Sequence, residues 1–138
     1  MTDKKCVMVI DGALPVGQVA NTSAILGATL GKYAPTQVGD AVVDASEKEH
    51  LGIITIPVAV LRGNKPLLKD LRERLYTEEY KELVVADFSD VAQSCNRYDE
   101  YIEKAAAVPE REHTYLGIAI YGDKKAVNRL TGSMPLLR

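Results

Sequence analysis

The sequence predicts an α/β protein with three layers, α/β/α, in which helices cover both faces of a mixed sheet of four or more strands. Two observations lead to this prediction. Short apolar runs typical of strands alternate with segments whose apolar residues recur at helical spacing, and a hairpin breaks a strictly parallel strand order. The chain has 138 residues, of which 46% are hydrophobic, so we expect residues 1–138 to form one domain.

The first part of the chain is predicted to hold a buried strand and a long helix. Residues 6–10 form a short apolar run that ends at Asp11. Pro15 presets the first turn of a helix whose apolar residues recur as far as Tyr33. Small residues stand four apart along it in two rows, Ala20, Ala24 and Ala28, and Ser23, Gly27 and Gly31. Such rows let another backbone approach closely, so we expect the helix to pack against the sheet or a partner chain.

A hairpin is predicted next. The apolar segment 41–45 precedes the polar turn 46–50, and a β-branched run follows over residues 53–61. Pro57 interrupts this run and cannot donate a hydrogen bond to a neighbouring strand. The run should therefore lie at a sheet edge, contain a bulge, or end its pairing near Pro57.

The second half of the chain is predicted to alternate helix and strand. Apolar spacing, Pro and Asp at helix starts, and β-branched runs define the elements. They are a helix from about Pro66, a strand over 83–88, a helix that carries Tyr98 to Ala105 and is ended by Pro109, a strand over 115–121, and a short helix capped by Asp123 that ends at Gly132.

Composition excludes several classes of protein. The formal charge of −2 lacks the basic excess with which proteins neutralise nucleic-acid phosphates. The sequence has neither a run of about eighteen apolar residues nor the pattern of a signal peptide. Cys6 and Cys95 have no partner at metal-ligand spacing, and no phosphate-binding loop is present. We expect a cytoplasmic protein with no cofactor or metal, and with no nucleic-acid or membrane partner.

Both ends of the chain resemble a known family. Residues 4–20, a strand, loop and helix start, and residues 126–137, which contain Leu130-Thr131-Gly132, resemble the ends of the type II peptidyl-tRNA hydrolases. Over its full length the chain more closely resembles an uncharacterised bacterial family, domain-of-unknown-function family 2000, thought to share the hydrolase fold. The resemblance implies the same three-layer fold.

The resemblance also points to the start of the first helix. The hydrolases open this helix with Gly-Lys-x-Ala-Ala-Gln-x-x-His-Ala, and alignment on Gly17 places Gln18 at the lysine, Thr22 at the glutamine and Ile25 at the histidine. The cation and the imidazole are therefore both absent. Gln18, Asn21 and Thr22 stand at i, i+3 and i+4, where they could hold a small polar ligand near free backbone N–H groups. The alternative is a solvent-facing polar stripe.

Two further candidates follow strands. Asp87 matches the aspartate of the hydrolases' Asp-Ala-Gly-x-Thr-Gln segment and could act as a general base, although an aspartate there often caps the next turn. Tyr121 lies near the end of another predicted strand. Ligands tend to sit beyond the carboxyl ends of parallel strands, so we expect Asp87 and Tyr121 to meet Gln18, Asn21 and Thr22 in one concavity.

Two classes of function remain. The first is a homodimeric module that binds a small ligand or a protein and lacks efficient peptidyl-tRNA hydrolase activity. The second is a hydrolase of an ester or amide that uses Asp87 as its catalytic residue. Loss of the lysine and histidine favours the binding module.

Overall fold

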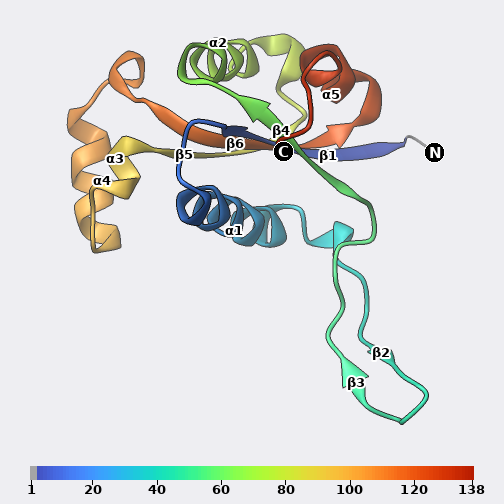
Figure 1. The fold of residues 1–138 in the computed structure, drawn as a ribbon. Coiled ribbons are helices and arrows are strands. Elements are labelled where there is room, and N and C mark those ends of the chain that lie inside the picture. Colours follow the sequence, from blue (N-terminus) through green and yellow to red (C-terminus); the bar gives the residue numbers. More distant parts are fainter. Residues whose placement is uncertain (1–2) are drawn as a thin grey trace.

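The computed structural model describes residues 3–138. A four-stranded mixed sheet lies at its centre, with helices on both faces (Figure 1). The strands, in the order β4-β1-β6-β5, are β1 (Lys4–Asp11), β4 (Val58–Gly63), β5 (Val84–Ser89) and β6 (Tyr115–Asp123). The predicted three-layer α/β/α fold class is confirmed.

Strand direction decides which loops lie together. β1 and β4 are parallel, whereas β6 runs antiparallel to both β1 and β5. The carboxyl ends of β1, β4 and β5 therefore lie at the same end of the strands as the start of β6. The carboxyl end of β6 lies at the opposite end of the strands.

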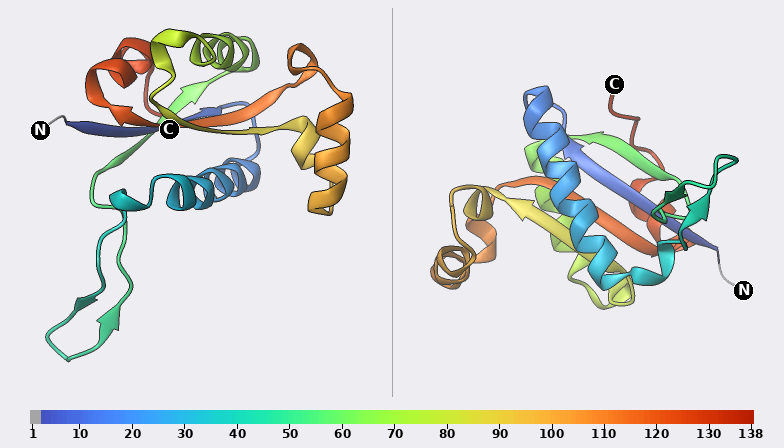
Figure 2. Two further views of the ribbon diagram at one scale, coloured as in Figure 1. Left: turned by 180° about the vertical axis from the view of Figure 1, so that it is seen from behind. Right: turned by 90° about the horizontal axis from the view of Figure 1, so that it is seen from below.

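Helices cover the two faces unequally. α1 (Val16–Tyr33) lies across one face, and α2 (Lys65–Leu75) and α5 (Lys124–Thr131) lie on the other (Figure 2). Alternate residues of β1 supply the two cores, since Val7 and Val9 pack toward α2 and α5 while Met8 and Ile10 pack toward α1.

Shorter helical segments complete the fold. Figure 1 shows α3 and α4 beyond the β5 side of the sheet. The segments are α3 (Asp90–Gln93), α4 (Tyr98–Ala107), and the 3-10 turns η1 (Pro35–Gln37), η2 (Glu78–Tyr80) and η3 (Glu110–Glu112).

Local signals set the helix starts as predicted. Pro15 precedes α1. The side chain of Asn64 accepts a hydrogen bond from the Leu67 N–H at 2.9 Å at the start of α2. The side chain of Asp123 accepts one from the Ala126 N–H at 3.2 Å at the start of α5. These bonds satisfy N–H groups that a helix start leaves free.

A long loop, residues 38–57, projects from the body and is called the arm below (Figure 1). It contains β2 (Val42–Val43) and β3 (Glu49–His50), which pair antiparallel near its tip. A hairpin is therefore present, but its second strand, β3, lies inside the predicted turn 46–50, and the run 53–61 is neither its second strand nor one strand. β4 begins directly after Pro57 as an edge strand, because the chain reaches a partner strand, β1, only there.

Candidate functional site

The residues predicted at the start of α1 do not form one ligand-facing group. Gln18 and Asn21 are exposed, whereas Thr22 is buried at 1% exposure. A Cβ added at Gly117 of β6 would lie 2.8 Å from the Thr22 methyl group, so Thr22 packs against the sheet. Successive residues are turned by about 100° around a helix, which separates Thr22 from Asn21.

Asp87 lies on the edge strand β5, half-buried. Its Oδ2 accepts a hydrogen bond from Arg72 Nε of α2 at 2.8 Å. It lines a cavity of about 380 Å³ together with Ile25 of α1 and Tyr101 of α4. Gln18, Asn21 and Thr22 are not among the residues that line this cavity.

The expectation that Tyr121 joins the same site is wrong. Tyr121 pairs with Cys6 near the start of β1 and with Val84 at the start of β5. Tyr121 therefore lies at the other end of the strands from the carboxyl ends of β1, β4 and β5. The error has one physical cause, the antiparallel direction of β6, which the apolar pattern of a strand does not encode.

A polar network on the α2 face lies close to Asp87. Lys69 Nζ pairs with Glu110 Oε2 at 2.9 Å, and the hydroxyl of Tyr115 donates to the same oxygen at 2.7 Å. The guanidinium carbon of Arg72 lies 3.8 Å from the centre of the Tyr76 ring, so the two side chains stack.

Two pKa values reflect this network. Burial raises the pKa of Tyr115, and its bond to Glu110 raises it further. Burial alone would raise the pKa of Glu110, but the hydrogen bonds from Tyr115 and Lys69 outweigh it and lower that pKa. The network thus holds a neutral phenol against a stabilised carboxylate.

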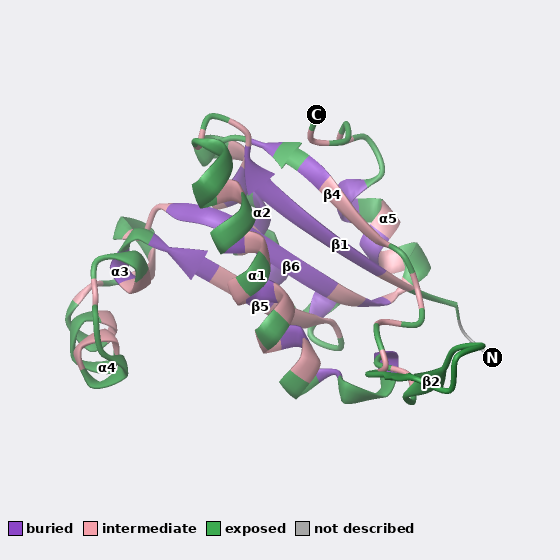
Figure 3. Ribbon diagram, turned by 60° about the horizontal axis from the view of Figure 1, so that its bottom comes forward, coloured by how far each residue is buried: buried purple, intermediate pink, exposed green. Residues whose placement is uncertain are grey.

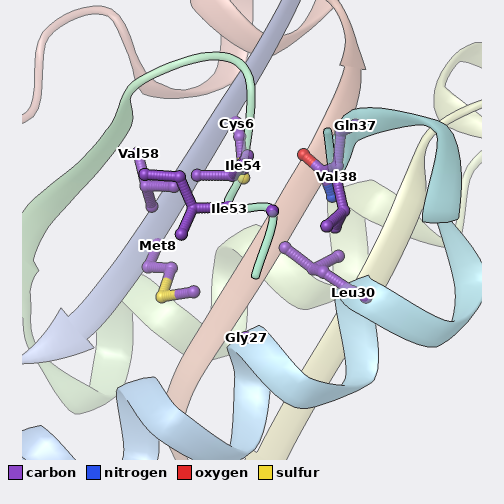
Figure 4. Close-up of a pocket in the computed structure, with 11 residues that line it drawn as sticks. Cys6, Met8, Gly27, Leu30, Gln37, Val38, Ile53, Ile54 and Val58 are labelled. Carbon is purple, nitrogen blue, oxygen red and sulfur yellow. The ribbon is translucent and has the colours of Figure 1, made fainter. Parts of the chain in front are cut away.

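A second cavity, of about 360 Å³, lies under the base of the arm (Figure 4). Met8 of β1, Val58 of β4 and Leu30 of α1 line it. Ile53 and Ile54 of the arm also line it. This cavity is therefore lined largely by apolar side chains and is partly open to solvent.

The row of small residues on α1 makes room for this cavity. Gly27 and Gly31 both line it. A Cβ added at Gly31 would meet no atom within 4 Å, and one at Gly27 would meet only the Met8 methyl group, at 3.7 Å. α1 packs on the sheet as predicted, but these glycines leave an open space beside it.

Gln37 supplies a polar group in this apolar cavity. Its side chain is 3% exposed, and within residues 3–138 its Oε1 has no hydrogen-bond partner. In Figure 4 this oxygen points in among the apolar lining side chains. The main-chain carbonyl of Gln37 accepts bonds from Thr55 N at 2.7 Å and Thr55 Oγ1 at 2.9 Å, which fix the residue at the base of the arm.

The chemistry available in the cavity is restricted. Burial raises the pKa of the lining residue Cys6 to about 11, so its thiol is neutral near pH 7 and a poor nucleophile. In the described part of the chain no three His, Cys, Asp or Glu residues gather as a group that could hold a metal ion. No helix in residues 3–138 combines the length and apolar character needed to cross a membrane.

Sequence reasoning missed Gln37 and the cavity. A glutamine after Pro35 and Thr36 reads as part of a polar loop, and its burial depends on the arm folding back over it. The row Ser23, Gly27 and Gly31 was the signal that could have located the cavity.

Comparisons with known proteins agree with this fold. The chain matches the sequence model of the family described as "Protein of unknown function (DUF2000)" over residues 4–138. No curated protein matches it. A solved structure of a protein of unknown function from Agrobacterium tumefaciens strain C58 has a TM-score of 0.86 at 16% identity, over 99% of this chain and 98% of that one. That likeness shows the fold, and the match along nearly the whole sequence shows that the chain belongs to the DUF2000 family of proteins of unknown function.

Proposed function

We propose that the chain is a small-ligand-binding module that holds a largely apolar molecule in the cavity under the arm. The observation that carries this proposal is the unpartnered Oε1 of Gln37. A buried acceptor with no partner destabilises a fold by about 1–3 kcal/mol. A ligand that donates a hydrogen bond to Gln37 would remove this penalty.

Size and lining narrow the class of ligand. The volume of about 360 Å³ falls in the range of roughly 300–1,000 Å³ that is usual for small-molecule sites. The lining side chains of Met8, Leu30 and Ile53 are apolar and uncharged. The ligand is therefore an uncharged, mainly hydrocarbon or aromatic molecule with one hydroxyl or N–H donor. This differs from the small polar ligand that the sequence suggests at the start of α1.

A matched thermal-shift screen tests the proposal, because a ligand that binds the native state raises Tm by mass action. The screen uses pairs of apolar compounds that differ only in an O–H or N–H group replaced by methyl. The donor compounds are expected to raise Tm more than their methylated partners. A Gly31→Leu variant should lose the shift, since its side chain enters the cavity. No shift with any compound, or equal shifts within every pair and in the variant, would contradict the proposal.

Efficient peptidyl-tRNA hydrolysis is not part of the proposed function. Gln18 replaces the lysine of the hydrolases, and an amide cannot supply a cation to a phosphate. Incubation of the purified protein with labelled peptidyl-tRNA should release peptide far more slowly than a type II hydrolase does. Turnover equal to that enzyme's would contradict this statement.

A hydrolase is the second candidate, and one observation favours it. Asp87 and Tyr101 line the same cavity of about 380 Å³. Burial, with the charge of Asp87, raises the pKa of Tyr101, so this phenol keeps its proton at neutral pH and can donate a hydrogen bond. A carboxylate and a phenol could orient water and a substrate carbonyl. In an ester-hydrolysis screen, Asp87→Asn should abolish any genuine activity and leave cooperative unfolding intact.

We further propose that residues 1–138 form one domain and that the protein is a homodimer. Strands from both ends of the chain, β1 and β6, lie side by side in the sheet, which supports one domain. Exposed apolar side chains on the arm support the homodimer. The cytoplasmic location expected from the sequence stays a prediction.

A further inference from the structure

We propose that two copies of the chain pair through their arms, which lie antiparallel so that each acidic tip contacts a basic patch at the root of the other arm. This inference rests on the proposed homodimer and specifies its interface. It shares Val38 and Ile53 with the lining of the cavity under the arm, but its test measures the dimer and not a ligand.

The arm exposes an unusual number of apolar side chains. Among residues 3–138, eleven large hydrophobic residues are exposed, and five of them belong to the arm, with exposed fractions between 43% and 83%. They are Val38, Val42, Val43, Leu51 and Ile53. Figure 3 shows that β2 and the surrounding arm are exposed, in contrast to the buried strands of the sheet. Such a concentration on one projecting segment is typical of an interaction surface.

The arm also has little internal support. Near its base the Gly39 N–H donates to the Ile53 carbonyl at 2.9 Å, and near its tip the Asp44 N–H donates to the Lys48 carbonyl at 2.9 Å. The carboxylate of Asp44 orders the tip by accepting bonds from the N–H groups of Ser46 and Lys48. A lone two-stranded hairpin is marginally stable in water, so a projecting arm with a defined tip needs a surface to pack on.

Charge identifies that surface as a second copy. The arm carries four carboxylates and one ammonium, from Asp40, Asp44, Glu47, Glu49 and Lys48. Its root adjoins three lysines, Lys4, Lys5 and Lys124, which we call the root patch. Asp123 pairs with Lys4 across the sheet and the main-chain carbonyl of Asp3 accepts a hydrogen bond from the Lys124 N–H, so three positive charges stand against two negative ones.

The root patch is also hollowed. A cavity of about 280 Å³ is lined by Lys4, Lys5 and Lys124, and by the arm's last residues, Ile56 and Pro57. Within one chain the acidic tip projects away from this cavity (Figure 1). The complementary charges of one chain therefore cannot meet each other, and they can meet those of another copy.

Two-fold symmetry satisfies both contacts at once. If two arms lie antiparallel, the tip of each reaches the root of the other, whatever the angle between the bodies. Each of the two segments that run between the base and the tip of the arm has about eight extended residues and spans roughly 26 Å. The apolar side chains of these segments would pack against the partner's arm along this length. The interface then has an apolar centre with a charged contact at each end.

Reciprocal charge reversal tests this arrangement by analytical ultracentrifugation. The tip variant is Glu47→Lys with Glu49→Lys, and the root variant is Lys4→Glu with Lys124→Glu. Asp44 is left unchanged because it orders the tip. Each variant alone is expected to raise the dimer Kd about tenfold or more, since like charges then face each other at both ends. An equimolar mixture should restore tight pairing, because each heterodimer again joins opposite charges.

Matched controls separate the possible failures. Arg74→Glu with Arg111→Glu makes the same charge change as the root variant, on exposed residues away from the root patch, and should leave the dimer Kd unchanged. Unfolding curves of all variants should be superimposable at dilutions where every protein is monomeric, because pairing of native chains itself adds stability. A monomeric wild-type protein would overturn both the homodimer and the arm pairing. A dimer that resists both reversals, or a mixture that fails to recover, would overturn the arm pairing alone. Ligand-induced Tm shifts report separately on the cavity.

Discussion

Two regions on opposite faces of the sheet differ in whether their polar side chains have hydrogen-bond partners. On the α2 face, Arg72 donates a hydrogen bond to Asp87 at 2.8 Å. Glu110 accepts one from Tyr115 at 2.7 Å and pairs with Lys69 at 2.9 Å. On the α1 face, Gln37 keeps an unpartnered oxygen inside an apolar cavity. The bonds of the first region, among them the Arg72–Asp87 pair that we call the clamp, have the properties of structural contacts. The second region has the properties of a ligand-binding site.

The contrast teaches how to weigh candidate residues. Asp87 has the chemistry of a catalytic group, yet its Oδ2 is engaged by a guanidinium that also stacks on Tyr76. Gln37 has no catalytic chemistry, yet its oxygen has an unmet hydrogen-bonding requirement. An unmet requirement in a cavity is the stronger sign of binding, because most buried polar groups in folded proteins are paired. Of the two unpartnered buried side-chain atoms in residues 3–138, Thr22 Oγ1 and Gln37 Oε1, only the second belongs to a residue that lines the cavity.

The largest expected effect concerns the clamp. Arg72→Met should lower the free energy of unfolding by roughly 2 kcal/mol, because it leaves the half-buried Asp87 carboxylate without its partner. Urea unfolding measures this loss. Arg74→Met, on the exposed side of the same helix, is the matched control and should change little. Equal effects of the two substitutions would show that the clamp does not stabilise the fold.

The next effect has the opposite sign. Gln37→Met keeps the side chain's length and removes the unpartnered acceptor, so it should raise the free energy of unfolding of the unliganded protein by about 1 kcal/mol. The same change should weaken binding of a donor-bearing ligand about tenfold, equivalent to 1.4 kcal/mol. Urea unfolding and calorimetric titration report the two quantities. A destabilised variant would mean that Gln37 serves the fold rather than a ligand.

A smaller effect compares the two ends of α1. Gly31→Ala and Gly17→Ala each place a methyl group where no atom lies within 4 Å. Each should raise the free energy of unfolding by up to about 1 kcal/mol, because Ala favours a helix over Gly. Only Gly31 lines the cavity, so only its substitution should weaken the ligand-dependent Tm shift. If Gly17→Ala and not Gly31→Ala weakened the ligand-dependent Tm shift, the ligand would bind at the start of α1 and not in the cavity.

The sequence carried most of the fold and little of the site. Periodicity and capping residues such as Pro15 and Asp123 locate the helices, because these signals are local. The direction of β6 is not local, and it moved Tyr121 to the far end of the strands. The burial of Thr22 and Gln37 depends on which surfaces lie over them, namely the sheet and the arm.

The last comparison uses pH to separate the two regions. The pKa of Glu110 is lowered on folding, so its contribution is present above the ordinary glutamate pKa and is lost as pH falls through the lower, folded value. The pKa of Cys6 is raised from 9.0 to about 11, so the unfolded chain loses this proton first and stability falls as pH rises above about 9. Glu110→Gln should therefore flatten part of the acid limb of a stability–pH curve, and Cys6→Ala part of the alkaline limb. Urea unfolding from pH 3 to 11 would show this, and an acid limb unchanged by Glu110→Gln, or an alkaline limb unchanged by Cys6→Ala, would contradict the contribution assigned to that residue.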